Sequence, residues 1–220
     1  MSGGIDPATG RCTRVPEETA GPFPGDGSNG PSVLAATGVV RSDIRSSFAG
    51  LSGTATDVPL DLELMLVSSS DCAVLANRAV HLWHCSRDGL YSLNSAGATN
   101  QNWLRGVQVA DASGVVRFRT IFPGCYAGRW PHMHFEVFAS LAASTDRNNK
   151  VATSQIALPK ATCDTVYATT GYEASVRNLA GQPLASDGIF RDGASLQLAT
   201  LSGDVASGYI ARLTIAVSGA

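Results

Sequence analysis

Two of the four histidines lie close together, at positions 132 and 134. If residues 132–138 form a β-strand, both imidazoles point to one face of the strand and Met133 points to the other. Two imidazoles on one face can supply half of the ligands of a transition-metal site. The pair alone also fits two hydrogen-bonded histidines in a protein core, so its interpretation depends on the residues around it.

The other two histidines, His81 and His84, are three residues apart on an expected strand over 79–84. This odd spacing sends the two rings to opposite faces of the strand. They are therefore poor joint metal ligands. We expect one of them to serve packing and the other, at most, to line a site.

Two other metal chemistries fit parts of this pattern. A zinc hydrolase could use His132 and His134, but the chain has neither an HExxH motif nor a set of three clustered histidines. Glu136 lies two residues beyond His134 and on the same strand face. An iron(II) site with two histidines and one carboxylate is therefore an alternative at this stage.

The elements that must position these residues are short and alternate between apolar and polar side chains. Such alternation, with turn dipeptides such as Asp88-Gly89 and Ser113-Gly114 between the stretches, is typical of β-sandwiches and barrels. We predict an all-β, single-domain β-sandwich with few short helices. Its helical turns are expected near 100–104 and 163–168, and its strands over 60–67, 79–84, 115–120, 132–138, 153–158 and 208–217.

The first thirty residues are rich in glycine and proline. We expect them to form an extended N-terminal arm that lies over the domain. No repeat or low-complexity linker divides the rest of the chain. We therefore predict a flexible N-terminal segment over 1–15 and one β-sandwich domain over 16–220.

Composition excludes several classes of partner. The 220 residues are 44% hydrophobic and only 15% charged, which is typical of a globular protein. The net charge is -2 and no run of Lys or Arg stands out, so we expect neither nucleic acid nor a membrane surface as a partner. No apolar stretch is long enough to span a bilayer, and the first residues lack the features of a signal peptide.

Five cysteines are scattered along the chain without CxxC spacing. This favours one or two disulfides, and hence a secreted or periplasmic protein; buried free thiols in a cytoplasmic protein are the alternative. The candidate pairs are Cys72–Cys85 and Cys125–Cys163, with Cys12 left over.

The stretch around the histidine pair resembles the iron-binding region of the intradiol ring-cleavage dioxygenases, which include catechol and protocatechuate dioxygenases. This stretch runs from Phe122-Pro123-Gly124-Cys125-Tyr126 to Arg129-Trp130-Pro131-His132-Met133-His134-Phe135. The resemblance covers residues 16–217, and two tyrosines followed by His-x-His in this order are far more specific than either motif alone. Further matching segments are 19–23, 80–85, 88–91, 104–108 and 187–190.

The resemblance implies a mononuclear iron(III) cofactor with four protein ligands, namely Tyr91, Tyr126, His132 and His134. The choice is physically sensible, because anionic phenolate oxygens stabilise hard iron(III) over iron(II). A free tyrosine titrates near pH ~10, so the charge of the metal is needed to ionise it at neutral pH. Of the two tyrosines, the resemblance implies that Tyr126 is displaced when a catechol binds and that Tyr91 stays.

The resemblance also assigns roles around the metal. Arg129 would stabilise the ketonised substrate, Gln155 would have a similar role, and the arm would line the substrate pocket. The implied reaction is the cleavage of a small aromatic diol by O2 between its two hydroxyl carbons, giving a muconate-type diacid. The pocket residues implied by the match are Thr19, Gly21, Pro22 and Phe23.

Three departures from the family pattern leave the substrate open among catechol, a substituted catechol, protocatechuate and a hydroxyquinol. The spacing from Tyr126 to His132 is shorter than in protocatechuate enzymes. The helical N-terminal dimerisation segment of the catechol enzymes is absent, so no oligomeric state is predicted. Phe23 stands where the protocatechuate type often has tyrosine.

A different class of function also fits the composition. A secreted β-sandwich could bind carbohydrate or protein without any chemistry, using Trp83, Trp103 and Trp130 as a surface platform. Burial of these rings in the core is the simpler expectation.

Overall fold

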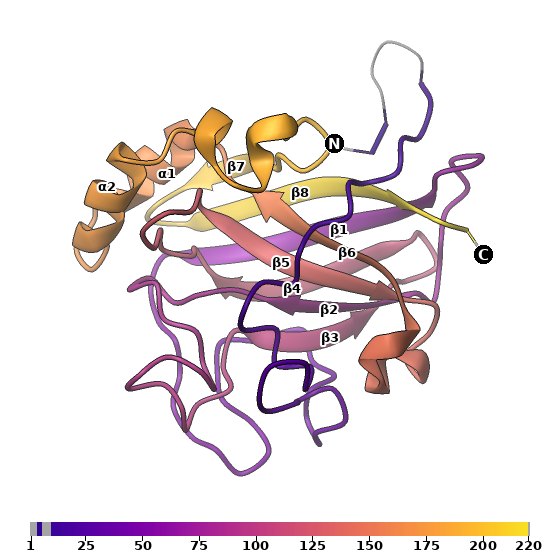
Figure 1. Cartoon of the computed structure of the whole chain (residues 1–220), viewed down its shortest axis with the longest axis horizontal. Coiled ribbons are helices and arrows are strands. Elements are labelled where there is room, and N and C mark those ends of the chain that lie inside the picture. Colours follow the sequence, from indigo (N-terminus) through magenta and orange to yellow (C-terminus); the bar gives the residue numbers. More distant parts are fainter. Residues whose placement is uncertain (1–3, 6–9, 220) are drawn as a thin grey trace.

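Two four-stranded sheets pack face to face at the centre of the molecule (Figure 1). A computed structural model describes residues 4, 5 and 10–219. The first sheet has the order β4-β1-β8-β7 and the second has the order β3-β2-β5-β6. The strands are β1 (Pro59–Ser68), β2 (Ala79–Trp83), β3 (Arg105–Val109), β4 (Val115–Ile121), β5 (His132–Phe138), β6 (Lys150–Ala157), β7 (Thr200–Asp204) and β8 (Gly208–Val217).

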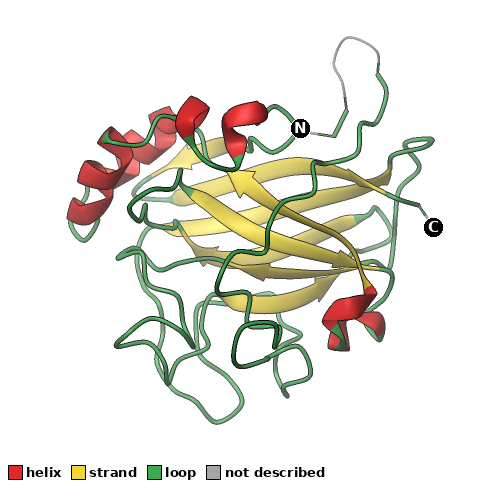
Figure 2. Cartoon of the chain, viewed as in Figure 1, coloured by secondary structure: helices red, strands yellow, loops and turns green. Residues whose placement is uncertain are grey.

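Helices are few and lie outside the two sheets (Figure 2). The two α-helices have eight residues each, and none of the described helices is long and apolar enough to cross a membrane. The prediction of an all-β sandwich is thus confirmed. The helices are α1 (Lys160–Tyr167), α2 (Glu173–Ala180) and the 3-10 turns η1 (Ala143–Thr145), η2 (Arg147–Asn149), η3 (Leu184–Ser186) and η4 (Phe190–Asp192).

Alternation along the strands builds the core between the sheets. On β5, Met133, Phe135 and Val137 are buried in the same apolar cluster as Leu62 and Leu64 of β1. Burial of each such side chain contributes about 1.5–3 kcal/mol to stability. The residues between them on β5 therefore point to the opposite, outer face of the second sheet. The pairing pattern of this sheet is antiparallel throughout, whereas β1 and β8 run parallel in the first sheet.

All six expected strands are present, but the structure corrects other expectations. Three elements were not predicted, namely β3, β7 and α2. Of the two strands, β3 contains a glycine and β7 is an exposed edge strand. The prediction of a helical turn near 100–104 is wrong. In that segment Asn102 and Leu104 make hydrogen bonds to residues 44–48 instead of to their own neighbours. The turn expected near 163–168 corresponds to α1.

The N-terminal arm crosses in front of β5 and β6 (Figure 1). Val15 is buried in the core, and the backbone N–H of Glu18 donates to the carbonyl of Thr153 on β6. Residues 1–3 and 6–9 lie outside the described residues, so the division into a flexible segment 1–15 and a domain 16–220 stays a prediction. The described residues 10–15 do contact the sandwich.

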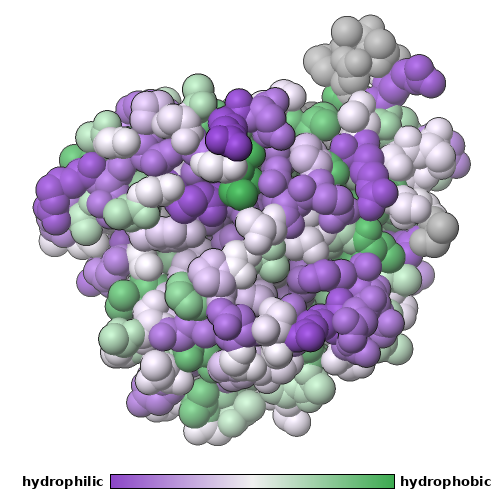
Figure 3. Space-filling model, in the orientation of Figure 1, coloured by the Kyte–Doolittle hydropathy of each residue, from purple (hydrophilic) through white to green (hydrophobic). Residues whose placement is uncertain are grey.

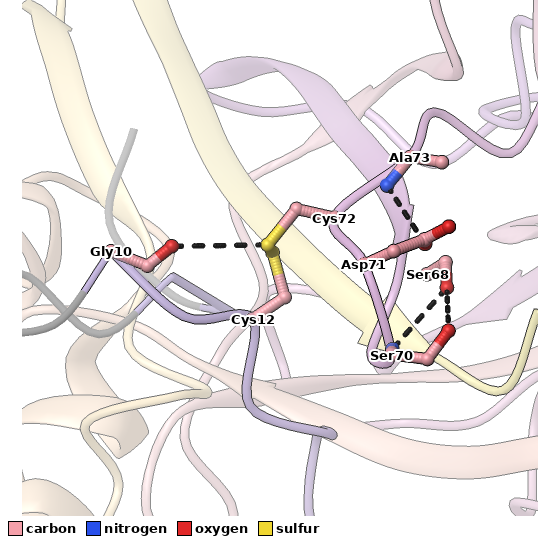
Figure 4. The surroundings of a disulfide bond; sticks show 7 residues. All are labelled: Gly10, Cys12, Ser68, Ser70, Asp71, Cys72 and Ala73. Atoms are coloured by element: carbon pink, nitrogen blue, oxygen red, sulfur yellow. Dashed lines mark hydrogen bonds between the residues drawn. A yellow bond between two sulfur atoms is a disulfide. The ribbon is translucent and has the colours of Figure 1, made fainter.

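A disulfide joins this arm to the turn between β1 and β2 (Figure 4). It links Cys12 to Cys72, with 5.4 Å between their Cα atoms. The candidate pairs Cys72–Cys85 and Cys125–Cys163 are therefore wrong. Cys85, Cys125 and Cys163 are free and buried, as small apolar side chains often are.

The face of the molecule in Figure 3 carries hydrophilic and hydrophobic residues side by side, without a broad apolar patch. Scattered apolar side chains of this kind are usual on protein surfaces.

Candidate active site

The histidine pair lies on the outer face of the second sheet, opposite the core residues of β5. Strand register places Trp83 of β2 and Gln155 of β6 directly beside His134. Side chains at such paired positions lie ~4.5–5.5 Å apart at their Cβ atoms. The sheet therefore forms a fixed floor, and the residues that complete the site come from loops and from the arm.

Three of the four residues implied as ligands meet at one point. The hydroxyl of Tyr126 lies 3.1 Å from Nε2 of His132, and this Nε2 lies 3.1 Å from Nε2 of His134. Both histidines are buried. Tyr126 comes from the loop between β4 and β5, so the loop and the strand together bring an oxygen and two nitrogens into contact.

The fourth residue, Tyr91, closes the group from the loop between β2 and β3. Its ring centroid lies 5.8 Å from that of Tyr126 and 6.2 Å from that of His134. The Tyr91 side chain is buried, and its hydroxyl has no hydrogen-bond partner among the described residues. A buried hydroxyl without a partner is rare and calls for an explanation such as a bound ion.

Each imidazole is held so that its Nε2 atom faces this point. Nδ1 of His132 is hydrogen-bonded to the carbonyl of Trp130. The ring of His134 stacks on the indole of Trp83, with centroids 5.0 Å apart and planes 6° apart. On its other side lies Gly21 of the arm, where a Cβ atom would be only 3.2 Å from Cε1 of His134.

Electrostatics keep these side chains neutral in the absence of a cation. Burial, with Arg129 nearby, lowers the pKa of His132 to about 3, and burial next to His132 lowers the pKa of His134 well below its ordinary value. Burial raises the pKa of Tyr126, and it raises that of Tyr91 well above the ordinary value. The imidazoles thus offer lone pairs at neutral pH, whereas the phenols need a positive charge to ionise.

This donor set fits iron(III). The phenol oxygen of Tyr126 and two imidazole nitrogens converge, and the ring of Tyr91, whose buried hydroxyl has no partner among the described residues, packs beside them. Hard oxygen donors match a hard, highly charged cation. Among the described residues, no group of three or more His, Cys, Asp or Glu side chains could hold a metal ion. A metal site here therefore depends on the tyrosines.

Arg129 and Gln155 lie beside this group and are bonded to each other. Nη2 of Arg129 donates to Oε1 of Gln155 over 2.6 Å, and Nη1 lies 3.5 Å from Nε2 of His132. Nε2 of Gln155 in turn donates to the carbonyl of Thr19 over 2.9 Å. The two residues with implied roles thus connect the histidine pair to the arm.

The four arm residues expected to line the pocket lie along this edge. Gly21 covers His134, and the ring of Phe23 lies 5.5 Å from that of Tyr91. Thr19 contributes its backbone carbonyl, and its side chain is exposed, as is Pro22. The arm therefore forms one wall of the site.

His81, His84 and Glu136 make their contacts outside the group formed by the tyrosines and the first histidine pair. His84 is buried and its Nε2 is hydrogen-bonded to Thr120 over 2.7 Å. His81 stacks on the far side of Trp83, 4.8 Å between centroids. The carboxylate of Glu136 accepts from Lys150 over 2.8 Å and lies next to His81. Its charge is compensated there, which disfavours a two-histidine, one-carboxylate site.

Sequence reasoning gave no role to Asp187 and did not place Trp83 beside His134. Asp187 is fully buried and accepts from Nε of Arg129 over 3.0 Å. Asp187 lies in the segment 187–190 that resembles the family, but the resemblance assigned no role to it. Trp83 could have been found from the strand register, which single-sequence patterns do not supply.

Comparisons with known proteins agree with this geometry. A family model described as "Dioxygenase" matches residues 64–162, a range that contains all four residues implied as ligands. An intradiol ring-cleavage dioxygenase from Tetranychus urticae has a similar structure, with a TM-score of 0.72 and 21% identity over 94% of this chain and 95% of that one. The chain has the intradiol dioxygenase fold. The resemblance inferred from the motifs is thereby confirmed.

Two further structures share the intradiol fold. The dioxygenase domain of a dioxygenase–carbohydrate-binding fusion from Streptomyces sp. SirexAA-E has a TM-score of 0.60 and 20% identity, covering 94% of this chain and all of that domain. A hydroxyquinol 1,2-dioxygenase from Pseudomonas putida DLL-E4 has a TM-score of 0.57 and 14% identity, covering 94% of this chain and 67% of that one. No curated protein matches the sequence significantly.

Proposed function

We propose that this chain is an iron(III) intradiol dioxygenase that uses O2 to open a catechol-type ring between its two hydroxyl carbons, yielding a muconate-type diacid. The observation that carries the proposal is the meeting of the Tyr126 hydroxyl with Nε2 of His132 and of His134, with the ring of buried Tyr91 packed beside them. Two loops and one strand would have no reason to bring two phenols and two imidazoles together in a core built only for packing.

In this proposal the four residues hold the ferric ion, which would supply Lewis acidity and activate the chelated diol toward O2. A catechol must lose two protons to chelate. The phenolate oxygen of Tyr126 is placed to accept one of them as a general base. Tyr126 is only partly buried and lies on a loop, whereas Tyr91 is enclosed, so Tyr126 is the tyrosine that can leave its position.

Arg129 would act on the substrate side. Its Nη1 points toward Nε2 of His132, one of the residues that would hold the metal. A fixed guanidinium at that place stabilises negative charge that develops on the ring and its oxygen, and it does so more strongly away from water. The side chain of Arg129 is only 18% exposed, so its donors are largely shielded from solvent.

The binding-module alternative gains no support from the tryptophans. Trp83, Trp103 and Trp130 are 0%, 8% and 4% exposed. They fill the core and the floor of the site, and they do not form an exposed platform.

The proposal predicts about one iron per chain and a visible absorption band from ferric tyrosinate. The metal content and spectrum of purified protein check this, followed by oxygen uptake with a panel of catechol, substituted catechols, protocatechuate and hydroxyquinol. Uptake with at least one diol, with a ring-cleaved diacid as product, is expected. Stoichiometric zinc, no visible band and no uptake after loading with iron would end the proposal.

We also propose that the protein works in an oxidising compartment, either secreted or periplasmic. The support is the Cys12–Cys72 disulfide, since structural disulfides persist mainly outside the cytoplasm. Unreduced, denatured protein should therefore show three thiols that react with a probe and two more after reduction, from the counts of free and bonded cysteines. Five reactive thiols before reduction would contradict both the disulfide and the compartment.

A further inference from the structure

Asp187 is a buried carboxylate with four donors around it. It lies between η3 and η4 and is 0% exposed. One oxygen, Oδ1, accepts from the backbone N–H groups of Ile189 and Phe190 over 2.9 and 3.2 Å. The other, Oδ2, accepts from the backbone N–H of Trp130 over 2.6 Å and from Nε of Arg129 over 3.0 Å. The carboxylate is therefore fixed by its own turn and can orient what it binds.

The guanidinium of Arg129 has three nitrogen atoms, and two of them are hydrogen-bonded to acidic or amide side chains. Nε is bound by Asp187 and Nη2 by Gln155, which leaves Nη1 directed at Nε2 of His132. A guanidinium is a planar fork, so fixing two nitrogen atoms also fixes the direction of the third. Without the carboxylate, the side chain could rotate about its long stem and lose this direction.

From these contacts we infer that Asp187 is a positioning residue for Arg129: it holds the guanidinium with Nη1 facing the proposed iron site and compensates its charge. This inference rests on the proposed function for its catalytic meaning. The same carboxylate oxygen also fixes Trp130, whose carbonyl bonds Nδ1 of His132. One acidic side chain thus anchors both the arginine and the segment that orients a proposed ligand.

The charge of Asp187 is consistent with this role. Burial alone would raise its pKa, but the hydrogen bonds from Arg129 and from the N–H groups of Trp130 and Ile189 lower the pKa below its ordinary value. A charge-assisted bond between carboxylate and guanidinium is stronger than a neutral one. A largely shielded Arg129 without this partner would be an unpaired charge, which is unfavourable.

The geometry can be tested first in metal-free protein, without any activity. Proton–nitrogen NMR should show an Arg129 Nε–H signal that exchanges slowly with water, assigned by its loss in Arg129→Ala. The exposed Arg177 of α2 provides the comparison. This measurement needs no Asp187 variant and so does not depend on whether such a variant folds. An Arg129 signal that exchanges as fast as that of Arg177 would overturn the inference.

The catalytic consequence is tested in iron-loaded protein with Asp187→Asn, which keeps the size of the side chain. We expect kcat to fall about 10- to 100-fold with KM changed less than about threefold, and iron content and the visible band unchanged. In an Arg129→Ala background, the same replacement should cost no further turnover, because coupled residues are not additive. Asp192→Asn, an exposed acid nearby, is the matched control and should be neutral.

Two results would overturn the positioning role. If Asp187→Asn lowers turnover equally in the wild-type protein and in the Arg129→Ala variant, Asp187 acts independently of Arg129. Loss of iron or of the visible band in Asp187→Asn, with an Arg129 Nε–H signal that still exchanges slowly in this variant, would show a role in holding the ligand segment alone. If the wild-type protein itself binds no iron, the proposed function fails, and the NMR result still decides whether Asp187 fixes Arg129.

Discussion

Arg129→Ala is expected to lower the turnover of catechols by about two to three orders of magnitude while iron stays bound. Removal of one preorganised donor to a developing oxyanion typically has an effect of this size. Arg129 is not among the four proposed ligands, and its contact with His132 is long, at 3.5 Å. The metal should therefore remain when the guanidinium is lost.

The measurement is steady-state oxygen uptake at matched iron content, together with the visible spectrum. Arg177→Ala on the exposed face of α2 serves as the control and should leave turnover unchanged. Because Arg129 also pairs with buried Asp187, some loss of stability is expected and should be measured separately by thermal unfolding. Unchanged turnover in folded, iron-loaded Arg129→Ala would remove Arg129 from the proposed chemistry.

The two tyrosines should respond differently to phenylalanine. We expect Tyr126→Phe to keep most of its iron and to bind a catechol, yet to turn over far more slowly, because a built-in base is lost. A bidentate dianion needs two coordination positions, and the departing Tyr126 would provide one. Tyr91→Phe should instead weaken iron retention, since Tyr91 is enclosed and its hydroxyl has no other partner among the described residues.

Metal content and anaerobic catechol titrations of both variants, followed by their visible spectra, distinguish the roles. Phe23 packs against Tyr91 and is not a proposed ligand, so the metal content of Phe23→Leu is a control for disturbed packing; its catechol binding is not compared, because Phe23 lines the proposed pocket. The assignment is reversed if Tyr126→Phe loses its iron while Tyr91→Phe keeps it and still binds catechol.

The glycines beside Tyr126 illustrate a limit of sequence reasoning. Flanking Gly124 and Gly128 suggest a freely moving loop, but a Cβ at Gly124 would lie 2.2 Å from the carbonyl oxygen of Arg87. Gly124 is therefore needed for close packing of two backbones. Gly128 has a positive φ of 84° and open space around it, so on that side of Tyr126 the loop is not held by close packing.

Local patterns predicted the parts of the site that one strand controls. The alternation around Met133 placed both histidines on one face, and β5 has the predicted bounds. The contacts of Asp187 with Arg129 and of Trp83 with His134 join distant segments, and no local pattern encodes them. The family resemblance, and not periodicity, brought Tyr91 into the group.

The disulfide was mispredicted for the same reason. The pairing of Cys12 depends on the path of the arm past the turn after β1, and four cysteines already allow three pairings. The edge strand β7 was missed because it contains Gly203 and little apolar alternation.

The parallel pairing of β1 with β8 sets the order in which the chain assembles during synthesis. The second sheet is built from residues 79–157 and can pair as soon as they leave the ribosome. In the first sheet β1 and β4 can also pair early, but the sheet is completed only with β8, because Leu60 pairs with Tyr209. Such distant pairing is slow to form. The beginning of the arm also waits, since Arg14 bridges to Ala216 of the same strand. The stretch around Glu18 and Thr19 can bind β6 early, whereas the arm is anchored at Arg14 only after translation has reached the last strand.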